Sequence, residues 1–271
     1  MMQWTQSMQV AHLYIHPVKS LGAMAVARAD IDRFGLQWDR RWMVVDDNGK
    51  FITQRQQARM ALIKVRMAGE EVILTGPDGS ELGFSAADFA AGPMLSVQVW
   101  RDECQAQVAE ARINHWLSHQ LQLSCRLVFM PESSRRTVDP DYAGPGHTVG
   151  FADGYPLLLT QQSSLEDFNR HMSINIGMER FRPNVVVTGA GPWQEDLWRV
   201  IQIGSTVFDV VKPCSRCAIP TIDPVDASKQ PEVFRTLQKT RSRDGEVFFG
   251  QNLVPRSEGQ LQVGDPVTVL A

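Results

Sequence analysis

The sequence contains few cysteines and no long apolar run. Four cysteines in 271 residues are too sparse for the disulfide framework that holds small secreted domains together. No apolar run approaches the ~18 residues that a membrane span needs. The first ten residues, MMQWTQSMQV, also lack the basic and apolar regions of a signal peptide. We therefore expect a cytoplasmic protein that does not associate with a membrane.

The sequence also lacks an excess of charge of one sign. It has 27 lysines and arginines against 30 aspartates and glutamates, a net charge of −3. A general nucleic-acid surface or a polybasic membrane surface is not expected, although a local basic pocket fits this composition. Hydrophobic residues make up 43% of the chain, which is enough for a substantial core in one large domain or two small ones.

Short strand patterns separated by turns dominate the first hundred residues. Residues 40–56 have two apolar-rich arms around Asn48-Gly49, a pair typical of a type I′ hairpin turn. Residues 71–84 repeat this pattern around Pro77-Asp78-Gly79. Further strands are predicted at 10–15, 60–65 and 95–100. This spacing indicates a β-rich barrel or sandwich.

Helical signals are fewer. An amphipathic stripe predicts a helix over 111–121, and Ser163 with Glu166 forms a capping-box pattern for a helix to about 171. Pro231 is placed to begin a third helix over 231–241. The strands expected between and after these helices are 184–188, 200–203, 206–211, 246–249 and 266–270.

Residues 131–154 are rich in Pro, Gly, Ser and Asp and have almost no apolar periodicity. We interpret them as a long loop, either a linker or part of an active site, with Arg135 and Arg136 on its surface. The chain is then divided into a β-rich part over 1–130 and a second β-rich part over 131–271.

The sharpest motif is Lys212-Pro213-Cys214-Ser215-Arg216-Cys217. A zinc site would need a second cysteine pair, yet Cys104 and Cys125 are 21 positions apart. Thioredoxin-like chemistry is disfavoured because Pro220 opposes the helix that such a pair would open. The basic residues around the thiols favour thiolate, which can bind a soft or high-valent metal, act as a nucleophile or carry sulfur. Spacing alone does not choose among these roles, or between them and inert cysteines at a strand end.

Three basic segments accompany this motif. In HPVKS (16–20), Pro17 is expected to end a strand and expose Lys19 and Ser20, which could hold an oxyanion. In DRRW (39–42), a buried strand would turn its two arginines to opposite faces, and the inward one would need an anionic partner. RFRPN (180–184) forms a basic edge before a strand that looks buried. By contrast, GAGPW (189–193) lacks the context of a phosphate-binding loop.

The motifs HPVKS, DRRW, FRPN, PCSRC and VGDPV follow one another in this order along nearly the whole chain. In this respect the sequence resembles the MOSC family with its N-terminal β-barrel partner domain, and most closely YcbX-like proteins and the mitochondrial amidoxime-reducing components. The resemblance implies an α+β, β-rich fold. An N-terminal β-barrel-like domain would be followed by a MOSC β-barrel domain with a few helices.

The resemblance further implies a molybdenum cofactor, a molybdopterin whose metal is completed by one protein cysteine. That catalytic metal ligand falls on Cys217. The implied cofactor contacts fall on Lys19, Ser20, Arg40, Gly154, Tyr155, Arg182, Asn184, Ser215 and Arg216. A Thr-Ser pair of the amidoxime-reducing proteins is replaced here by Gly154-Tyr155, so backbone groups would have to serve in its place. Pyridoxal phosphate binding is a further term attached to the family as a whole.

The implied activity is the reduction of small N-hydroxylated compounds: hydroxylamines, amidoximes and N-hydroxylated bases. Several YcbX-like chains continue into a ferredoxin domain, whereas this sequence ends after the VGDPVTVL strand and has no four-cysteine cluster motif. We therefore expect a separate electron donor of the ferredoxin or flavoprotein type. The alternative is a non-redox protein in which Cys217 carries sulfur or which delivers the molybdenum cofactor. A purely structural role fits the placed cysteines and arginines less well.

Overall fold

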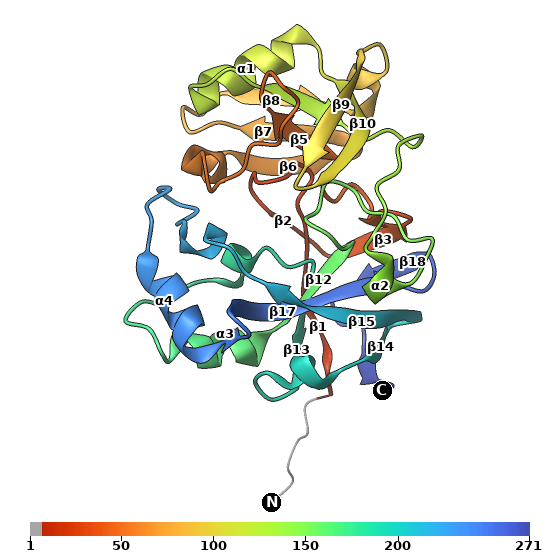
Figure 1. Ribbon diagram of the computed structural model, residues 1–271, viewed down its shortest axis with the longest axis vertical. Coiled ribbons are helices and arrows are strands. Elements are labelled where there is room, and N and C mark those ends of the chain that lie inside the picture. The colour runs from red at the N-terminus through yellow and green to blue at the C-terminus, as the bar shows by residue number, and fades with distance from the viewer. Residues whose placement is uncertain (1–6) are drawn as a thin grey trace, which may run out of the picture.

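The computed structural model describes residues 7–271 and is rich in strands, arranged in two stacked parts. The upper part in Figure 1 contains a four-stranded and a three-stranded sheet with one helix, and the lower part contains the largest sheet with the remaining helices. The helices are α1 (Ala111–Leu121), α2 (Pro140–Ala143), α3 (Gln162–Asn169) and α4 (Pro231–Thr240). No helix within the described range is long and apolar enough to cross a membrane.

The upper part encloses an aromatic core. Its four-stranded sheet has the order β5-β11-β10-β9, and the strands are β5 (Trp42–Val45), β9 (Met94–Val99), β10 (Asp102–Val108) and β11 (Arg126–Phe129). Its three-stranded sheet is β6 (Lys64–Ala68), β7 (Glu71–Thr75) and β8 (Glu81–Phe84). Trp42 packs against Phe84, Phe89 and Phe129 at the centre, with Leu117 of α1 in the same buried cluster.

The lower part is built on a nine-stranded sheet. Its order is β19-β14-β15-β17-β12-β13-β1-β2, with β16 paired to β17. The strands are β1 (Gln9–Ile15), β2 (Met24–Val26), β12 (Leu157–Gln161), β13 (Val185–Thr188), β14 (Val200–Ile203), β15 (Thr206–Ser215), β16 (Ser242–Arg243), β17 (Glu246–Pro255) and β19 (Val267–Val269). A small sheet of β3 (Arg28–Asp32), β4 (Gly35–Leu36) and β18 (Gly259–Gln262) completes this part.

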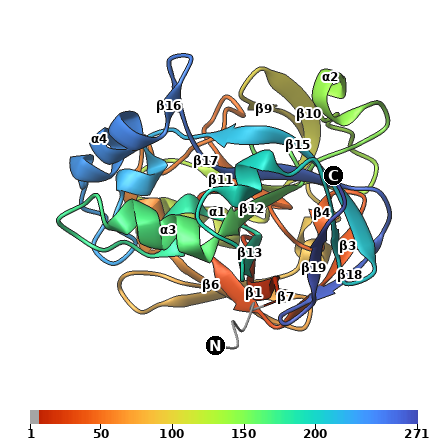
Figure 2. The same ribbon diagram turned by 90° about the horizontal axis from the view of Figure 1, so that it is seen from below.

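Two apolar cores cover the large sheet. One joins it to the small sheet, with Leu13, Val185 and Leu253 packed among Leu36 and Leu261. The other lies under α3 and α4, which Figure 2 shows on the same side of the molecule, and it is centred on Phe168, Phe181 and Phe249. The rings of Phe181 and Phe249 stack 3.7 Å apart. This packing fixes the segment just before Arg182.

The first strand of the chain pairs with a strand from the second half of the sequence. β1 pairs antiparallel with β13, from Gln9 opposite Thr188 to Leu13 opposite Val185. The chain then enters the upper part at β5 and returns after β11 (Figure 1). The segment HPVKS therefore lies where the two parts meet. The division of the chain at residue 130 stays a prediction.

Most of the predicted elements are confirmed, and three local predictions are wrong. The strand predicted at 60–65 begins only at Lys64, because residues 58–62 form a 3₁₀ helix beside which Gln57 and Arg59 donate to the last carbonyls of α1. The turn at 46–49 is not type I′: only Gly49 has a positive φ, and the Asp46 carboxylate accepts from the backbone N–H groups that follow it. The capping box is absent because Ser163 donates instead to the Ala190 carbonyl.

Candidate active site

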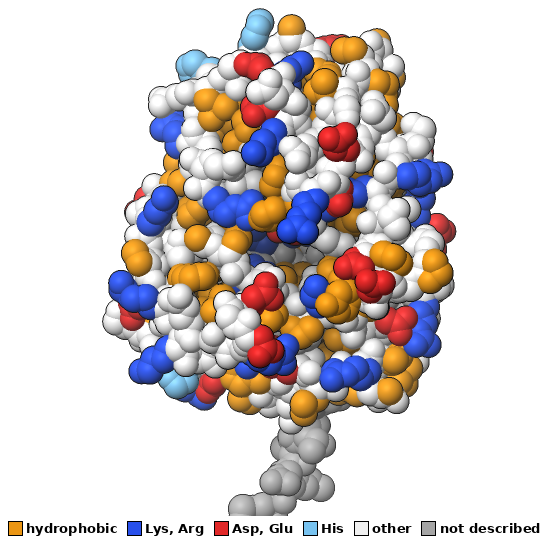
Figure 3. Space-filling model, viewed as in Figure 1, with side chains coloured by type: hydrophobic (Ala, Val, Ile, Leu, Met, Phe, Trp, Pro, Cys, Tyr) orange, Lys and Arg blue, Asp and Glu red, His pale blue; other side chains and the backbone are white. Residues whose placement is uncertain are grey.

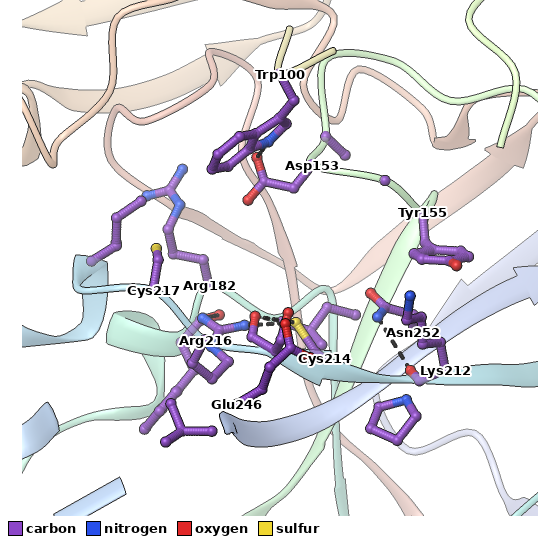
Figure 4. A pocket seen from close by; sticks show the side chains of 18 of the residues that line it. Trp100, Asp153, Tyr155, Arg182, Lys212, Cys214, Arg216, Cys217, Glu246 and Asn252 are labelled. Atoms are coloured by element: carbon purple, nitrogen blue, oxygen red, sulfur yellow. Dashed lines mark hydrogen bonds between the residues drawn. The ribbon is translucent and has the colours of Figure 1, made fainter. Parts of the chain in front are cut away.

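A cavity of about 680 Å³ lies between the two parts, and both line it. Figure 3 shows lysine and arginine side chains gathered around a hollow in the middle of the face, and Figure 4 shows this pocket from close by. Its lining includes every residue to which the sequence assigned a role: Lys19, Ser20, Arg40, Gly154, Tyr155, Arg182, Asn184, Ser215, Arg216 and Cys217. The structure thus brings together residues that are up to about 200 positions apart in the sequence.

Lys19 and Ser20 lie at the inner end of HPVKS. The sequence predicted that Pro17 would expose them, which is wrong: they are only 5% and 4% exposed. Their backbone is held against the start of β5, where the Lys19 N–H donates to the Trp42 carbonyl over 2.8 Å. The Lys19 ammonium donates to the Phe151 carbonyl (2.7 Å) and to Asp153 (2.5 Å). Both residues are therefore directed into the cavity rather than into bulk water.

Burial dominates the electrostatics of Lys19. It lowers the pKa of the ammonium to about 8, although the neighbouring Asp153 carboxylate acts in the opposite direction. The Asp153 side chain is itself exposed, and the Lys19 charge with hydrogen bonds from Lys19 and Trp100 holds the pKa of this carboxyl well below its usual range. The pair is therefore ionised at neutral pH, and the ammonium retains one N–H for another acceptor.

The two arginines of DRRW diverge, but not because a strand alternates. Strand β5 begins only at Trp42, and Arg40 has a left-handed φ of +48°. Arg40 donates to Asp39 (2.6 Å), to the Asn184 side chain (3.1 Å) and to the Arg182 carbonyl (3.0 Å). Arg41 is directed away from this group and donates to the Met130 carbonyl and Glu132. Both arginines are therefore enclosed, which corrects the expectation that only one turns inward. Each has an anionic partner, Asp39 for Arg40 and Glu132 for Arg41.

Arg182 is a cation of the cavity whose hydrogen bonding is incomplete. It follows a 3₁₀ helix (Met178–Phe181) in a left-handed conformation with φ +55°. Its Nη1 donates to the Leu21 carbonyl over 2.7 Å, whereas its enclosed Nη2 atom has no partner among the described residues. Burial and the nearby Arg40 charge lower the pKa of Arg182 to about 9. The guanidinium would therefore gain from an added anion.

Asn184 lines the cavity and also connects neighbouring segments through its side-chain hydrogen bonds. Its Nδ2 donates to the Tyr14 carbonyl (3.2 Å), and its Oδ1 accepts from the Leu158 N–H (3.1 Å) and from Arg40. These contacts join β1, β12 and the arginine pair. The side chain is 1% exposed, so its main contribution in this structure is to position Arg40.

The two thiols lie at the end of β15. Cys214 belongs to the strand and Cys217 follows it; both are half-buried and reduced. Arg216 donates to the Cys214 sulfur over 3.0 Å and to the Phe181 carbonyl over 2.7 Å, and its buried Nε is unpaired within residues 7–271. No described group of three or more His, Cys, Asp or Glu side chains could hold a metal ion. A metal here would need ligands supplied by a cofactor in addition to a thiol.

The 131–154 loop closes one side of the cavity. It contains α2, and Arg136 is buried within it, which corrects the expected surface position. Arg136 donates to the carbonyls of Gly150, Ala152 and Asp153 and to the Asp102 carboxylate. It thereby shapes the loop that presents Asp153. Burial raises the pKa of Tyr155, just after this loop, to about 12.

Sequence reasoning missed several residues that line the cavity, including Arg55, Trp100, Glu246 and Asn252. Trp100 donates to Asp153 over 3.0 Å, and the Arg55 guanidinium lies 4.3 Å from the indole ring. Neither belongs to a recognisable motif. Trp100 ends a predicted strand beside a turn, and only the packing of the two parts brings it to the cavity.

The cavity suits a polyanionic ligand that contains a soft metal. Its lining has six cationic side chains and only two carboxylates, Asp153 and Glu246. Two buried guanidinium nitrogens, Arg182 Nη2 and Arg216 Nε, have no hydrogen-bond acceptor among residues 7–271, and leaving such groups unpaired is costly. Thiols lie in the same lining. The donor set therefore fits a metal-bearing cofactor with an anionic group.

Comparison with known proteins identifies related sequences. Residues 7–124 match the MOSC N-terminal beta barrel domain, and residues 146–268 match the MOSC domain. The mitochondrial amidoxime-reducing component 1 of Mus musculus is 32% identical over 96% of this chain and 82% of its own length. The mitochondrial amidoxime reducing component 2 of Homo sapiens is 29% identical, over 95% and 82%. The solved structure of the YuaD protein from Bacillus subtilis covers 97% of this chain and 94% of its own, with 12% identity and a TM-score of 0.44.

These matches define a MOSC-domain protein with an N-terminal MOSC β-barrel domain, on the β-rich α+β fold that the sequence predicted. The chain belongs to the family that includes the mitochondrial amidoxime-reducing components, and the alignment extends over nearly its whole length.

Proposed function

We propose that this chain is a molybdenum-cofactor-dependent reductase of small N-hydroxylated compounds. The relatives are named for amidoxime reduction, which supports a reaction that cleaves an N–O bond. The observation that carries the proposal is that all ten residues assigned from the family resemblance line one cavity. Two unpaired guanidinium nitrogens and two reduced cysteines lie in that lining.

The residues have separable roles in this proposal. Arg182 and Arg216 would bind the anionic part of the cofactor, because each has an unpaired buried N–H. Lys19 would add its remaining N–H, and Arg40 would hold its place through Asp39 and Asn184. Cys217 would be the metal ligand. Cys214 already accepts a hydrogen bond from Arg216, which leaves Cys217 as the thiol without a partner in the described chain.

The net reaction is R–NHOH + 2 e⁻ + 2 H⁺ → R–NH₂ + H₂O. When bound, the cofactor would supply two-electron redox chemistry, and the protein would supply binding and orientation. The electrons would come from a separate donor of the ferredoxin or flavoprotein type. The aromatic side chains of Trp100, Tyr155 and Phe234 also line the cavity.

The test is metal and pterin analysis followed by turnover. Protein from a cofactor-competent host should contain nearly one molybdenum and one pterin per chain. With reduced viologen, it should convert benzamidoxime to benzamidine. Protein without molybdenum that releases sulfur with cyanide would instead support the sulfur-carrier alternative. Bound molybdenum without turnover on amidoximes, hydroxylamines or N-hydroxylated bases would favour cofactor delivery.

A further inference from the structure

Trp100 has an unusual backbone conformation at the tip of the β9–β10 hairpin. It lies between Val99 and Asp102, which are paired in the sheet, and its φ is +58°. A left-handed φ is uncommon for a bulky side chain and persists where the surroundings fix it. Here the conformation directs a large aromatic side chain from the N-terminal part toward the cavity (Figure 4).

Contacts on several sides fix the indole ring without burying it. Its Nε1 donates to Asp153, from the opposite part of the molecule, over 3.0 Å. The Arg55 guanidinium lies 4.3 Å from the ring centroid, and the Phe51 ring lies 5.4 Å away. Trp100 is nevertheless 44% exposed. An aromatic ring that is already ordered and still accessible can stack on a ligand at little further entropic cost.

The ring lies opposite the thiols. In the close view, Trp100 is on one side of the cavity, and Cys214 and Cys217 are on the other side (Figure 4). All three residues belong to the same lining. A substrate whose N–O group approaches the cysteines would therefore place the rest of its body near the indole.

We propose that Trp100 is a specificity-determining residue that stacks on the planar ring of the substrate. The inference rests on the proposed function and names the substrates that this chain prefers: N-hydroxylated compounds with a flat, conjugated ring, such as aryl amidoximes. Aliphatic hydroxylamines have no π surface for the indole. Because stacking on an aromatic side chain contributes a measurable part of the binding free energy, its loss should weaken binding by about tenfold.

The experiment compares Trp100→Leu and Trp100→Phe with the unsubstituted holoprotein. The probes are benzamidoxime, which is planar, and N-methylhydroxylamine, which has no ring. Saturation-transfer NMR measures the dissociation constants, and assays with reduced viologen measure kcat and KM. In Trp100→Leu, the preference for benzamidoxime should fall about tenfold, mainly through KM. Trp100→Phe keeps an aromatic ring, so its preference for benzamidoxime should lie between those of the unsubstituted protein and Trp100→Leu.

Trp116 offers a matched control. Its indole Nε1 also donates a 3.0 Å hydrogen bond, to Ser80, but it packs on the core of the upper part and does not line the cavity. Trp116→Leu should leave the preference unchanged. Thermal unfolding of each variant separates a loss of stacking from a loss of fold, and Trp100→Phe provides the second comparison if Trp100→Leu unfolds.

The outcomes are distinct. Equal weakening of both ligands, or no change, would overturn the role of Trp100. Loss of pterin from Trp100→Leu would also overturn it, because the ring would then stack on the cofactor instead of the substrate. If the unsubstituted protein binds benzamidoxime in a Trp100-dependent way but reduces nothing, the proposed function fails while the binding role of Trp100 is supported. Failure of that protein to bind benzamidoxime would refute the inference itself.

Discussion

Arg182→Met should remove the cofactor without destabilising the cofactor-free protein. In the chain itself the guanidinium has one hydrogen bond, to the Leu21 carbonyl, and an enclosed Nη2 with no partner in the described residues. Arg40 lies close enough that its charge lowers the pKa of Arg182. Methionine has a similar length and carries no charge. Exchanging a partly enclosed charge that lacks a full set of partners for an apolar side chain removes its desolvation cost.

The expected loss of affinity follows from the bound state. A cofactor anion would pair with Arg182, and truncating one partner of an enclosed charged hydrogen bond costs about 2–5 kcal/mol. Because Arg182 is half-buried rather than fully buried, the lower part of that range, about 2–3 kcal/mol, is appropriate. At about 1.4 kcal/mol for each factor of ten, affinity should fall roughly 30- to 150-fold.

The control is Arg135→Met, because Arg135 is exposed and surface charges contribute only about 0–1 kcal/mol. Arg136 cannot serve as a control, since it is buried and holds the 150–153 carbonyls. Molybdenum by mass spectrometry and pterin by fluorescence measure retention, and thermal unfolding of cofactor-free protein measures stability. Equal retention in the two variants would mean that Arg182 binds no anion. A large loss of stability in cofactor-free Arg182→Met would show that its role is structural.

Three further predictions concern the same cavity. Cys217→Ser should lose molybdenum while Cys214→Ser retains it; metal analysis showing the reverse would exchange the two assignments. Because burial gives Lys19 a pKa of about 8 against an ordinary 10.5, the folded state loses this proton first, and the cofactor-free protein should gain stability as pH rises from about 8 to 10.5. Urea unfolding should show no such gain in Lys19→Met, and an identical pH profile in both proteins would contradict the burial argument. With NADH as the only reductant, the pure protein should be inactive, whereas reduced viologen should support turnover; NADH oxidation by protein free of flavoprotein would refute this.

The motifs meet at one cavity because each of them adjoins a strand that is predicted independently. HPVKS follows β1, FRPN precedes β13 and PCSRC ends β15. These strands belong to one sheet, so their flanking residues meet. Local turn and helix-end geometry was predicted wrongly where nearby polar side chains hydrogen-bond to the backbone. At 46–49, the Asp46 carboxylate accepts from the Asn48 and Lys50 N–H groups, and the type I′ turn expected for Asn48-Gly49 does not form.

The remaining features arise from packing between distant segments, which periodicity does not encode. Trp100 meets Asp153 across 53 positions, and Arg136 folds back on carbonyls 14 to 17 positions further along. Lys19 looked solvent-exposed after Pro17 because the covering strand β5 begins more than twenty positions later. The Lys19 N–H then bonds to the first residue of that strand. In each case the residue contacts a segment that is distant in the sequence, and the local sequence pattern does not predict where that segment lies.

The cavity is a product of the whole chain rather than of the MOSC domain alone. Lys19 donates to Phe151 and Asp153, more than 130 positions away, and Arg40 reaches Asn184 and the Arg182 carbonyl. Residues 131–271 by themselves would lack both cations, and β13 would lose its pairing with β1 and become an exposed edge. The first strand therefore has two linked functions. It completes the large sheet, and the HPVKS segment that follows it places Lys19 in the lining of the cavity.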